Sequence, residues 1–100
     1  MRTRNIRPGY FTNDVLAALP PLDRILFAAL WCLADCEGRL EDRPRRIKAE
    51  ALPYDDYDCD AGLTRLQEAG FVVRYRVGAG AFIAIPKFHE HQYLSADERK

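Results

Sequence analysis

The sequence predicts a mainly helical α+β domain that ends in a two-stranded β-hairpin. Three observations carry this prediction. Residues 25–34 are all apolar and have the spacing of a buried helix, and two shorter segments, 43–52 and 58–69, each show one apolar helical face. Residues 71–85 alternate around the turn Gly78-Ala79-Gly80, as a hairpin does.

Length and composition set the broad class. One hundred residues, of which 48% are hydrophobic and 30% charged, suit one folded domain. The net charge of +0 means that any nucleic-acid binding must come from a local patch. Three cysteines, an odd number, and the lack of an apolar segment after Met1 lead us to expect a cytoplasmic protein. The apolar run is shorter than the roughly 20 residues that cross a bilayer, so no membrane association is expected.

The N-terminal part combines a basic arm with a short helix. Residues 1–11 form the arm, which is either a mobile terminus or a strand of chain that lies along phosphates. Thr12 is expected to cap a helix over residues 13–18.

The long central helix is predicted to start at Pro21 and to end at Gly38. It is apolar on two sides, and the second stripe contains Phe27, Leu30 and Trp31. This stripe either packs inside the domain or forms a self-association face.

The second half of the chain starts with a short extended piece, 39–42, and the basic helix 43–52. An acidic turn follows, and Asp58 is expected to cap the helix 58–69, which Gly70 ends. In the hairpin, odd-numbered apolar residues from Phe71 to Val77 share one face and Arg74 and Arg76 the other. Phe88 is expected to fold back onto the domain.

This order of elements is that of a winged helix-turn-helix with an extra N-terminal helix, in which the hairpin is the wing and the helix from Asp58 is in the recognition position. We expect an arm at 1–11, the winged helix-turn-helix domain at 12–92 and a charged tail at 93–100.

Five segments also carry a family signature: IRPGYFTND at 6–14, EGRLEDRPRRIKAE at 37–50, PYDD at 53–56, AGFVVRY at 69–75 and IPKFHEHQ at 85–92. In these segments the chain resembles the DnaD-like replication initiators, or replisome organisers, of phages and prophages. The resemblance implies a winged-helix N-terminal domain, self-association, and a replicative helicase or its loader as a possible partner.

Clustered Arg and Lys suit duplex contact, because binding phosphates releases counterions. The predicted phosphate contacts are Arg2, Arg4, Arg7, Arg43, Arg45, Arg46, Lys48, Arg74 and Arg76. For base edges only Thr64, Arg65 and Gln67 are suitable, since the recognition helix begins among acidic residues that a phosphate-lined groove would repel. The alternative is that Asp55 and Asp56 face a basic protein partner.

Metal and catalytic sites are not expected. Residues 56–60 have the D-x-D-x-D start of a calcium loop, but Ala61 and Gln67 occupy the positions that require Gly and Glu. Cys32, Cys36, His89 and His91 do not have the spacing of a zinc site. No cofactor is implied.

Three functions are therefore weighed. The first is a non-enzymatic replication-initiation domain that binds duplex or single-stranded DNA through phosphates, with weak sequence preference. The second is a protein-interaction adaptor or inhibitor on the same scaffold, which does not bind DNA. A transcriptional repressor is third, because the acidic helix disfavours base reading.

Overall fold

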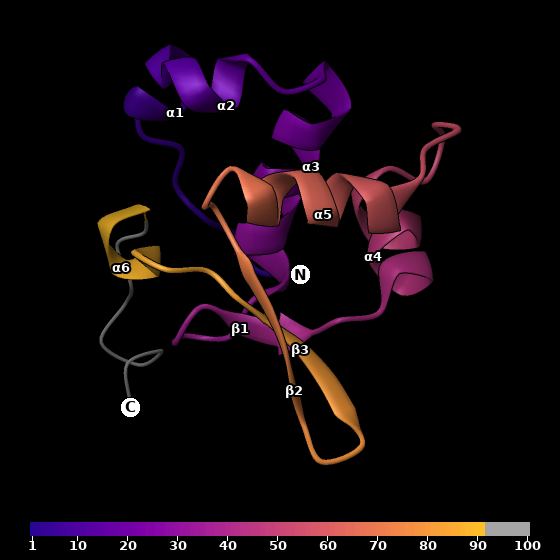
Figure 1. Cartoon of the computed structure of the whole chain (residues 1–100). Helices are drawn as coiled ribbons and strands as arrows, with labels where there is room; N and C mark the ends of the chain where they lie inside the picture. The colour runs from indigo at the N-terminus through magenta and orange to yellow at the C-terminus, as the bar shows by residue number, and fades with distance from the viewer. Residues whose placement is uncertain (92–100) are drawn as a thin grey trace.

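A computed structural model describes residues 1–91 of the chain as a mixed α+β fold that is mainly helical (Figure 1). The helices are α1 (Gly9–Thr12), α2 (Asp14–Ala17), α3 (Pro21–Leu33), α4 (Pro44–Ala51), α5 (Cys59–Glu68) and α6 (Phe88–His91). The strands are β1 (Arg39–Glu41), β2 (Val73–Val77) and β3 (Gly80–Ala84). The predicted tail at 93–100 lies outside the described residues.

The helices α3, α4 and α5 pack against one another, and the sheet lies below α5 in the view of Figure 1. The sheet is antiparallel with strand order β1-β3-β2, so the predicted extended piece pairs with the hairpin as a third strand. The main prediction of an α+β, mainly helical fold with a C-terminal hairpin is confirmed. Phe88 is also buried, at 1% exposure, as predicted.

The N-terminal helix differs from the prediction. Instead of one helix over 13–18 there are two single turns, α1 and α2. Asn13, not Thr12, is the cap of the second turn: its side chain accepts hydrogen bonds from the backbone N–H groups of Val15 and Leu16 at 3.0 and 3.1 Å. An amide or hydroxyl at either position satisfies capping chemistry, so sequence alone does not choose between them.

The central helix α3 also ends earlier than predicted, at Leu33. Gly38 is in the left-handed region (φ +76°) but belongs to the turn before β1. The side chain of Asp35 holds this turn by accepting from the N–H groups of Glu37 and Arg39, both at 2.9 Å. A Cβ at position 38 would lie 2.5 Å from Cβ of Phe88, so glycine is needed for α6 to pack here.

The second apolar stripe of α3 is core. Phe27, Leu30 and Trp31 are 1%, 0% and 2% exposed, so the prediction that they form a self-association face is wrong. Tyr10 covers Trp31 edge-on, with ring centroids 5.3 Å apart, and Phe71 packs on Phe27 at 5.2 Å. Aromatic residues from distant segments thus cover the stripe that the helix alone leaves open.

The residues of β2 alternate as predicted, but Arg74, predicted to contact phosphate, lies on the side of the strand that packs on the core. Val73 and Val77 are 46% and 64% exposed, whereas Ile83, opposite Arg74 in the register, is fully buried. Arg74 is therefore on the core side of β2. Alternation determines which residues share a face, but the packing of the rest of the chain determines which face is inside.

Candidate nucleic-acid interface

The basic helix α4 presents its charges in two directions. Arg45 and Lys48 border a hollow beside Asp58 and Asp60, on the α5 side. Arg43 and Arg46 instead line a groove on the other side of the helix. A rotation of about 100° per residue explains the division, because positions 45 and 48 each follow positions 43 and 46 by two residues, or about 200° around the helix.

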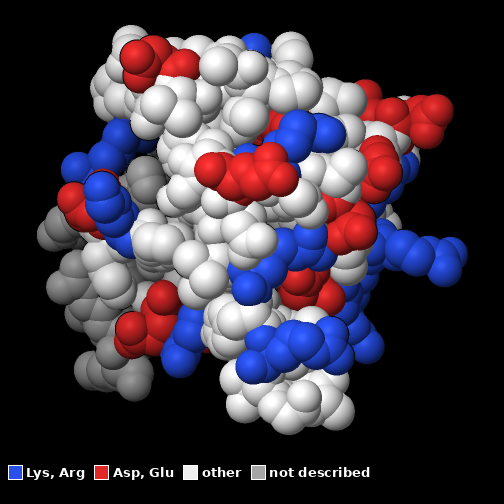
Figure 2. Space-filling view, viewed as in Figure 1, with Lys and Arg blue, Asp and Glu red and all other residues white. Residues whose placement is uncertain are grey.

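Three of these cations are available for a ligand. Within residues 1–91, the side chains of Arg45, Arg46 and Lys48 have no hydrogen bond or ion pair with another described group. Arg43 lies 3.5 Å from Glu41, in a pair whose side chains are both more than half exposed. Figure 2 shows that Lys and Arg side chains extend from α4 to the hairpin, interrupted by acidic ones.

Arg74, predicted to contact phosphate, instead forms ion pairs within the fold. Its guanidinium donates to both carboxylate oxygens of Asp42, at 2.7 and 3.0 Å, and to Asp60 at 2.6 Å. These partners raise the pKa of Arg74 further above its ordinary range. The side chain is 19% exposed, and its ion pairs hold the wing against α5 and against Asp42, which directly follows β1.

The groups predicted to read bases are engaged in the same network. Thr64 accepts from Arg74 at 3.1 Å and donates to the carbonyl of Asp60. Gln67 accepts the backbone N–H of Arg74 at 2.6 Å. Both side chains are exposed, yet the hydroxyl of Thr64 and the Oε1 atom of Gln67 are bonded to Arg74 of the wing.

Arg65, the third predicted base reader, pairs with a buried carboxylate that the sequence analysis missed. Its guanidinium donates to both oxygens of Asp23, at 2.7 and 2.9 Å, and the hydroxyl of Tyr57 donates to Asp23 at 2.5 Å. Burial alone would raise the pKa of Asp23, but these hydrogen bonds outweigh it and hold the pKa below its ordinary value. An Asp in the first turn of a helix also suits the helix dipole, so its sequence position gave no distinct signal.

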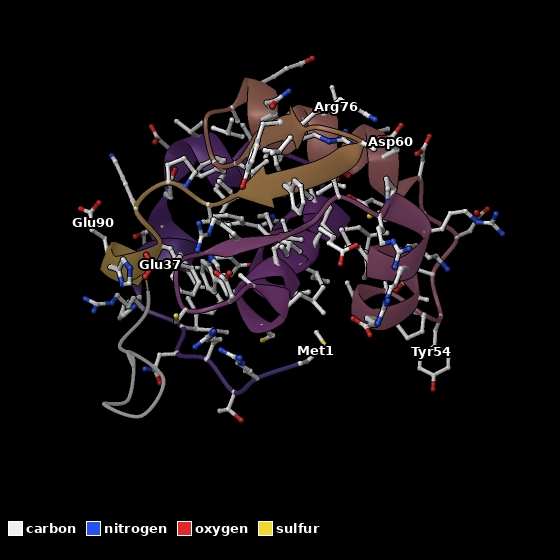
Figure 3. The ribbon with its side chains drawn as sticks, turned by 90° about the horizontal axis from the view of Figure 1, so that it is seen from below. Met1, Glu37, Tyr54, Asp60, Arg76 and Glu90 are labelled. Atoms are coloured by element: carbon white, nitrogen blue, oxygen red, sulfur yellow. The ribbon has the colours of Figure 1, made fainter. Side chains whose placement is uncertain are left out.

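The acidic residues before α5 have different roles. Asp58 caps the helix, as predicted, by accepting from the N–H of Ala61 at 3.1 Å. Asp60 is neutralised by Arg74. Asp55 and Asp56 are exposed, next to Tyr54, whose side chain is 99% exposed and points away from the molecule in Figure 3. At the other end of α5, Gly70 (φ +88°) forms the predicted C-terminal cap.

The basic arm is anchored at its start. The N–H of Arg2 donates to the carbonyl of Cys32 at 2.8 Å, and Arg4 donates to the carbonyls of Trp31 and Ala34 at 2.9 and 3.1 Å. Arg4 also lies over the Phe88 ring, 5.2 Å from its centroid. Arg4 therefore closes the C-terminal end of α3, where carbonyls lack helical partners, and the arm is not a free terminus. Arg7 is exposed.

The cysteines are all free thiols, and burial raises the pKa of Cys59 to about 11. Within the part of the chain that the structure describes, no three His, Cys, Asp or Glu side chains gather as a metal site would require. None of the helices over residues 1–91 is long and apolar enough to cross a membrane.

Comparisons add no relative: no protein-family model matches the sequence, and no curated protein or solved structure matches the chain.

Proposed function

We propose that this chain is a winged helix-turn-helix domain of the phage replication-initiation type, which binds DNA through phosphates and performs no catalysis. The order α3, β1, α4, α5, β2, β3, with β1 added to the hairpin, supports the winged-helix assignment. The replication role rests on the resemblance to DnaD-like initiators and on the cations described above.

The observation that carries the proposal is that three cations of α4 make no ion pair or hydrogen bond within residues 1–91. Arg45, Arg46 and Lys48 have no partner among residues 1–91, whereas Arg65 is paired with Asp23 and Arg74 with Asp42 and Asp60. Cations without an internal partner are the ones that can neutralise phosphate without first breaking an ion pair. The proposed DNA-binding surface is therefore α4 and the exposed Arg76 of the wing, a smaller set than the sequence predicted.

Sequence preference is expected to be weak. Thr64 and Gln67 are hydrogen-bonded to Arg74 of the wing and Arg65 is bonded to Asp23, so binding bases would compete with those bonds. Phosphate contact fixes a position on DNA but carries no sequence information directly. This argument also disfavours a repressor.

The test is fluorescence anisotropy with labelled duplex DNA over a salt series. Replacement of Arg45 and Arg46 by Glu is expected to abolish binding while leaving the circular dichroism spectrum unchanged. Lys87→Glu, a charge reversal at an exposed position outside α4 and the wing, is the matched control and should bind nearly as the parent does. In a plot of the logarithm of the binding constant against the logarithm of the salt concentration, the slope should be about −0.9 for each phosphate that the protein neutralises. Unchanged binding by the double variant would remove α4 from the interface.

Self-association and a replicative helicase or loader as partner are part of the proposal through the resemblance. Because Phe27, Leu30 and Trp31 are buried, a second copy would have to use other apolar residues. Phe11 and Val77 are 69% and 64% exposed and are available for such contact. Sedimentation equilibrium of the parent protein and of Phe11→Ser and Val77→Thr variants would show whether either residue supports an oligomer.

A second candidate is a protein-interaction module without DNA binding, and the exposed turn between α4 and α5 favours it. A tyrosine that is 99% exposed beside two exposed carboxylates is suited to docking on a basic protein surface. This candidate predicts no DNA binding at low salt, together with capture of a partner that Tyr54→Ala loses.

A further inference from the structure

A groove of about 650 Å³ lies between α4 and the wing, on the side of α4 opposite Arg45. Its walls come from the end of α3, β1, α4 and the hairpin, with Arg2 of the arm at one edge. Figure 3, which views the molecule from below, shows the arm ending at Met1 on this side. A volume of this size accommodates one or two nucleotide-sized groups.

One wall of the groove is aromatic. Tyr75 and Phe82 face each other across β2 and β3, with ring centroids 5.8 Å apart and ring planes 29° from parallel. They lie on the sheet face opposite Ile83, are only partly buried, and continue into Val77, which is 64% exposed. This surface is not part of the core, because the buried residues Ile83 and Val72 form the side of the hairpin that packs inside the domain.

The rim facing the aromatic wall is charged. Arg46 lines the groove with no internal partner among residues 1–91, and Arg43 is held only by its exposed contact with Glu41. Arg39 also lines the groove and pairs with Asp35 at 3.7 Å. The acidic lining residues are Asp35, Glu41 and Glu50. After the Arg39–Asp35 and Arg43–Glu41 pairs are formed, Arg46 and Glu50 are the α4 charges of the lining that have no ion pair within residues 1–91, and Arg46 is the one that can contact a phosphate.

Aromatic rings on which bases can stack, beside an arginine that can contact phosphate, are the combination that proteins use for single-stranded nucleic acid. A duplex cannot use it, because its bases are already stacked on each other and its phosphates are on the outside. A peptide would gain little from flat rings beside a guanidinium unless it were both aromatic and acidic. The groove also adjoins the cations of α4 that the proposed function assigns to DNA.

We propose that this groove binds single-stranded DNA, with a base on the Tyr75–Phe82 wall and the adjoining phosphate on Arg46. The inference rests on the proposed function and adds to it the form of DNA and the path of one strand. It divides α4 into a duplex side, Arg45 and Lys48, and a single-strand side, Arg43 and Arg46.

The test compares anisotropy of labelled oligo-thymidylate and of a hairpin duplex, with the full chain and matched variants. Arg46→Gln is expected to weaken single-strand binding roughly tenfold and to lower its salt slope by about 0.7, while duplex affinity changes little. Arg45→Gln removes the same charge from the same helix on the opposite side, and should weaken the duplex alone. Tyr75→Val, which keeps a strand-forming residue, should reduce single-strand affinity by about tenfold.

A second readout locates the strand directly. Oligo-thymidylate carrying 5-iodouracil should cross-link on irradiation to Tyr75 or Phe82, as identified by mass spectrometry of the digested protein. Cross-links confined to other residues, or equal effects of Arg45→Gln and Arg46→Gln on single-strand binding, would overturn the inference. Duplex binding without single-strand binding would refute the assignment of the groove to single-stranded DNA and leave the proposed function standing. Binding of neither form would refute both proposals.

Discussion

Replacing Gly62 by alanine tests how tightly α5 is held to α3. Gly62 is buried inside α5, against the Tyr57–Asp23 hydrogen bond. A Cβ there would lie 1.9 Å from the hydroxyl oxygen of Tyr57, 2.8 Å from Cζ of the same ring and 3.2 Å from Oδ1 of Asp23. The tyrosine ring must therefore move, and its bond to the carboxylate must break.

Two effects of opposite sign decide the size of the change. Alanine in a helix interior is favoured over glycine by about 1 kcal/mol. A hydrogen bond to an ionised group is worth about 1.5–3 kcal/mol, and forcing a larger side chain into a packed site costs about 1–3 kcal/mol. The loss exceeds the gain, so Gly62→Ala should destabilise the fold by about 2 kcal/mol. For a domain of this size, that lowers Tm by roughly 10 °C.

Urea unfolding followed by circular dichroism measures the change, and a double-mutant cycle identifies its cause. In a Tyr57→Ala background the clashing ring is absent, and the closest remaining contact is the carboxylate oxygen. Gly62→Ala should then be neutral or stabilising by up to about 1 kcal/mol. Equal destabilisation in both backgrounds would refute the reasoning.

Two further predictions concern the ion pairs. Asp23→Asn should cost about 2 kcal/mol at pH 7, because the buried carboxylate loses its charge-assisted hydrogen bonds from Arg65 and Tyr57, whereas the Arg65 side chain is 39% exposed and stays partly solvated. The folded-state pKa of Asp23 is lowered, so this stability is present above about pH 4 and is lost as pH falls through the folded pKa. The urea midpoints of parent and variant should therefore approach each other as the pH falls below about 4 toward the lowered folded-state pKa, and a difference that stays constant down to the acid-unfolding limit would argue against the pair. Arg74→Ala should lower stability by about 3 kcal/mol, because Asp42 is 8% exposed and would lose its partner, and Arg74→Lys should recover part of the loss. If thermal unfolding is unaffected and only DNA affinity falls, Arg74 is a phosphate contact after all.

The sequence by itself determined the elements that depend on local chemistry. The periodicity of α3, α4 and α5, the cap at Asp58 and the glycine at position 70 are each set by residues within a few positions of one another. The hairpin is equally local, since alternation and a glycine turn specify it. The basic character of α4 is likewise readable directly from the sequence.

Tertiary structure alone decided which charges remain free. Arg65 and Arg74 are no different in sequence from Arg45 and Arg46, but Asp23 and Asp42 lie 42 and 32 positions away from their partners and become neighbours only on folding. The same is true of the hairpin faces: the burial of Ile83 inside the fold makes Tyr75 and Phe82 a groove wall instead of core. Pairing and burial depend on long-range contacts, and these determine which residues remain available to a ligand.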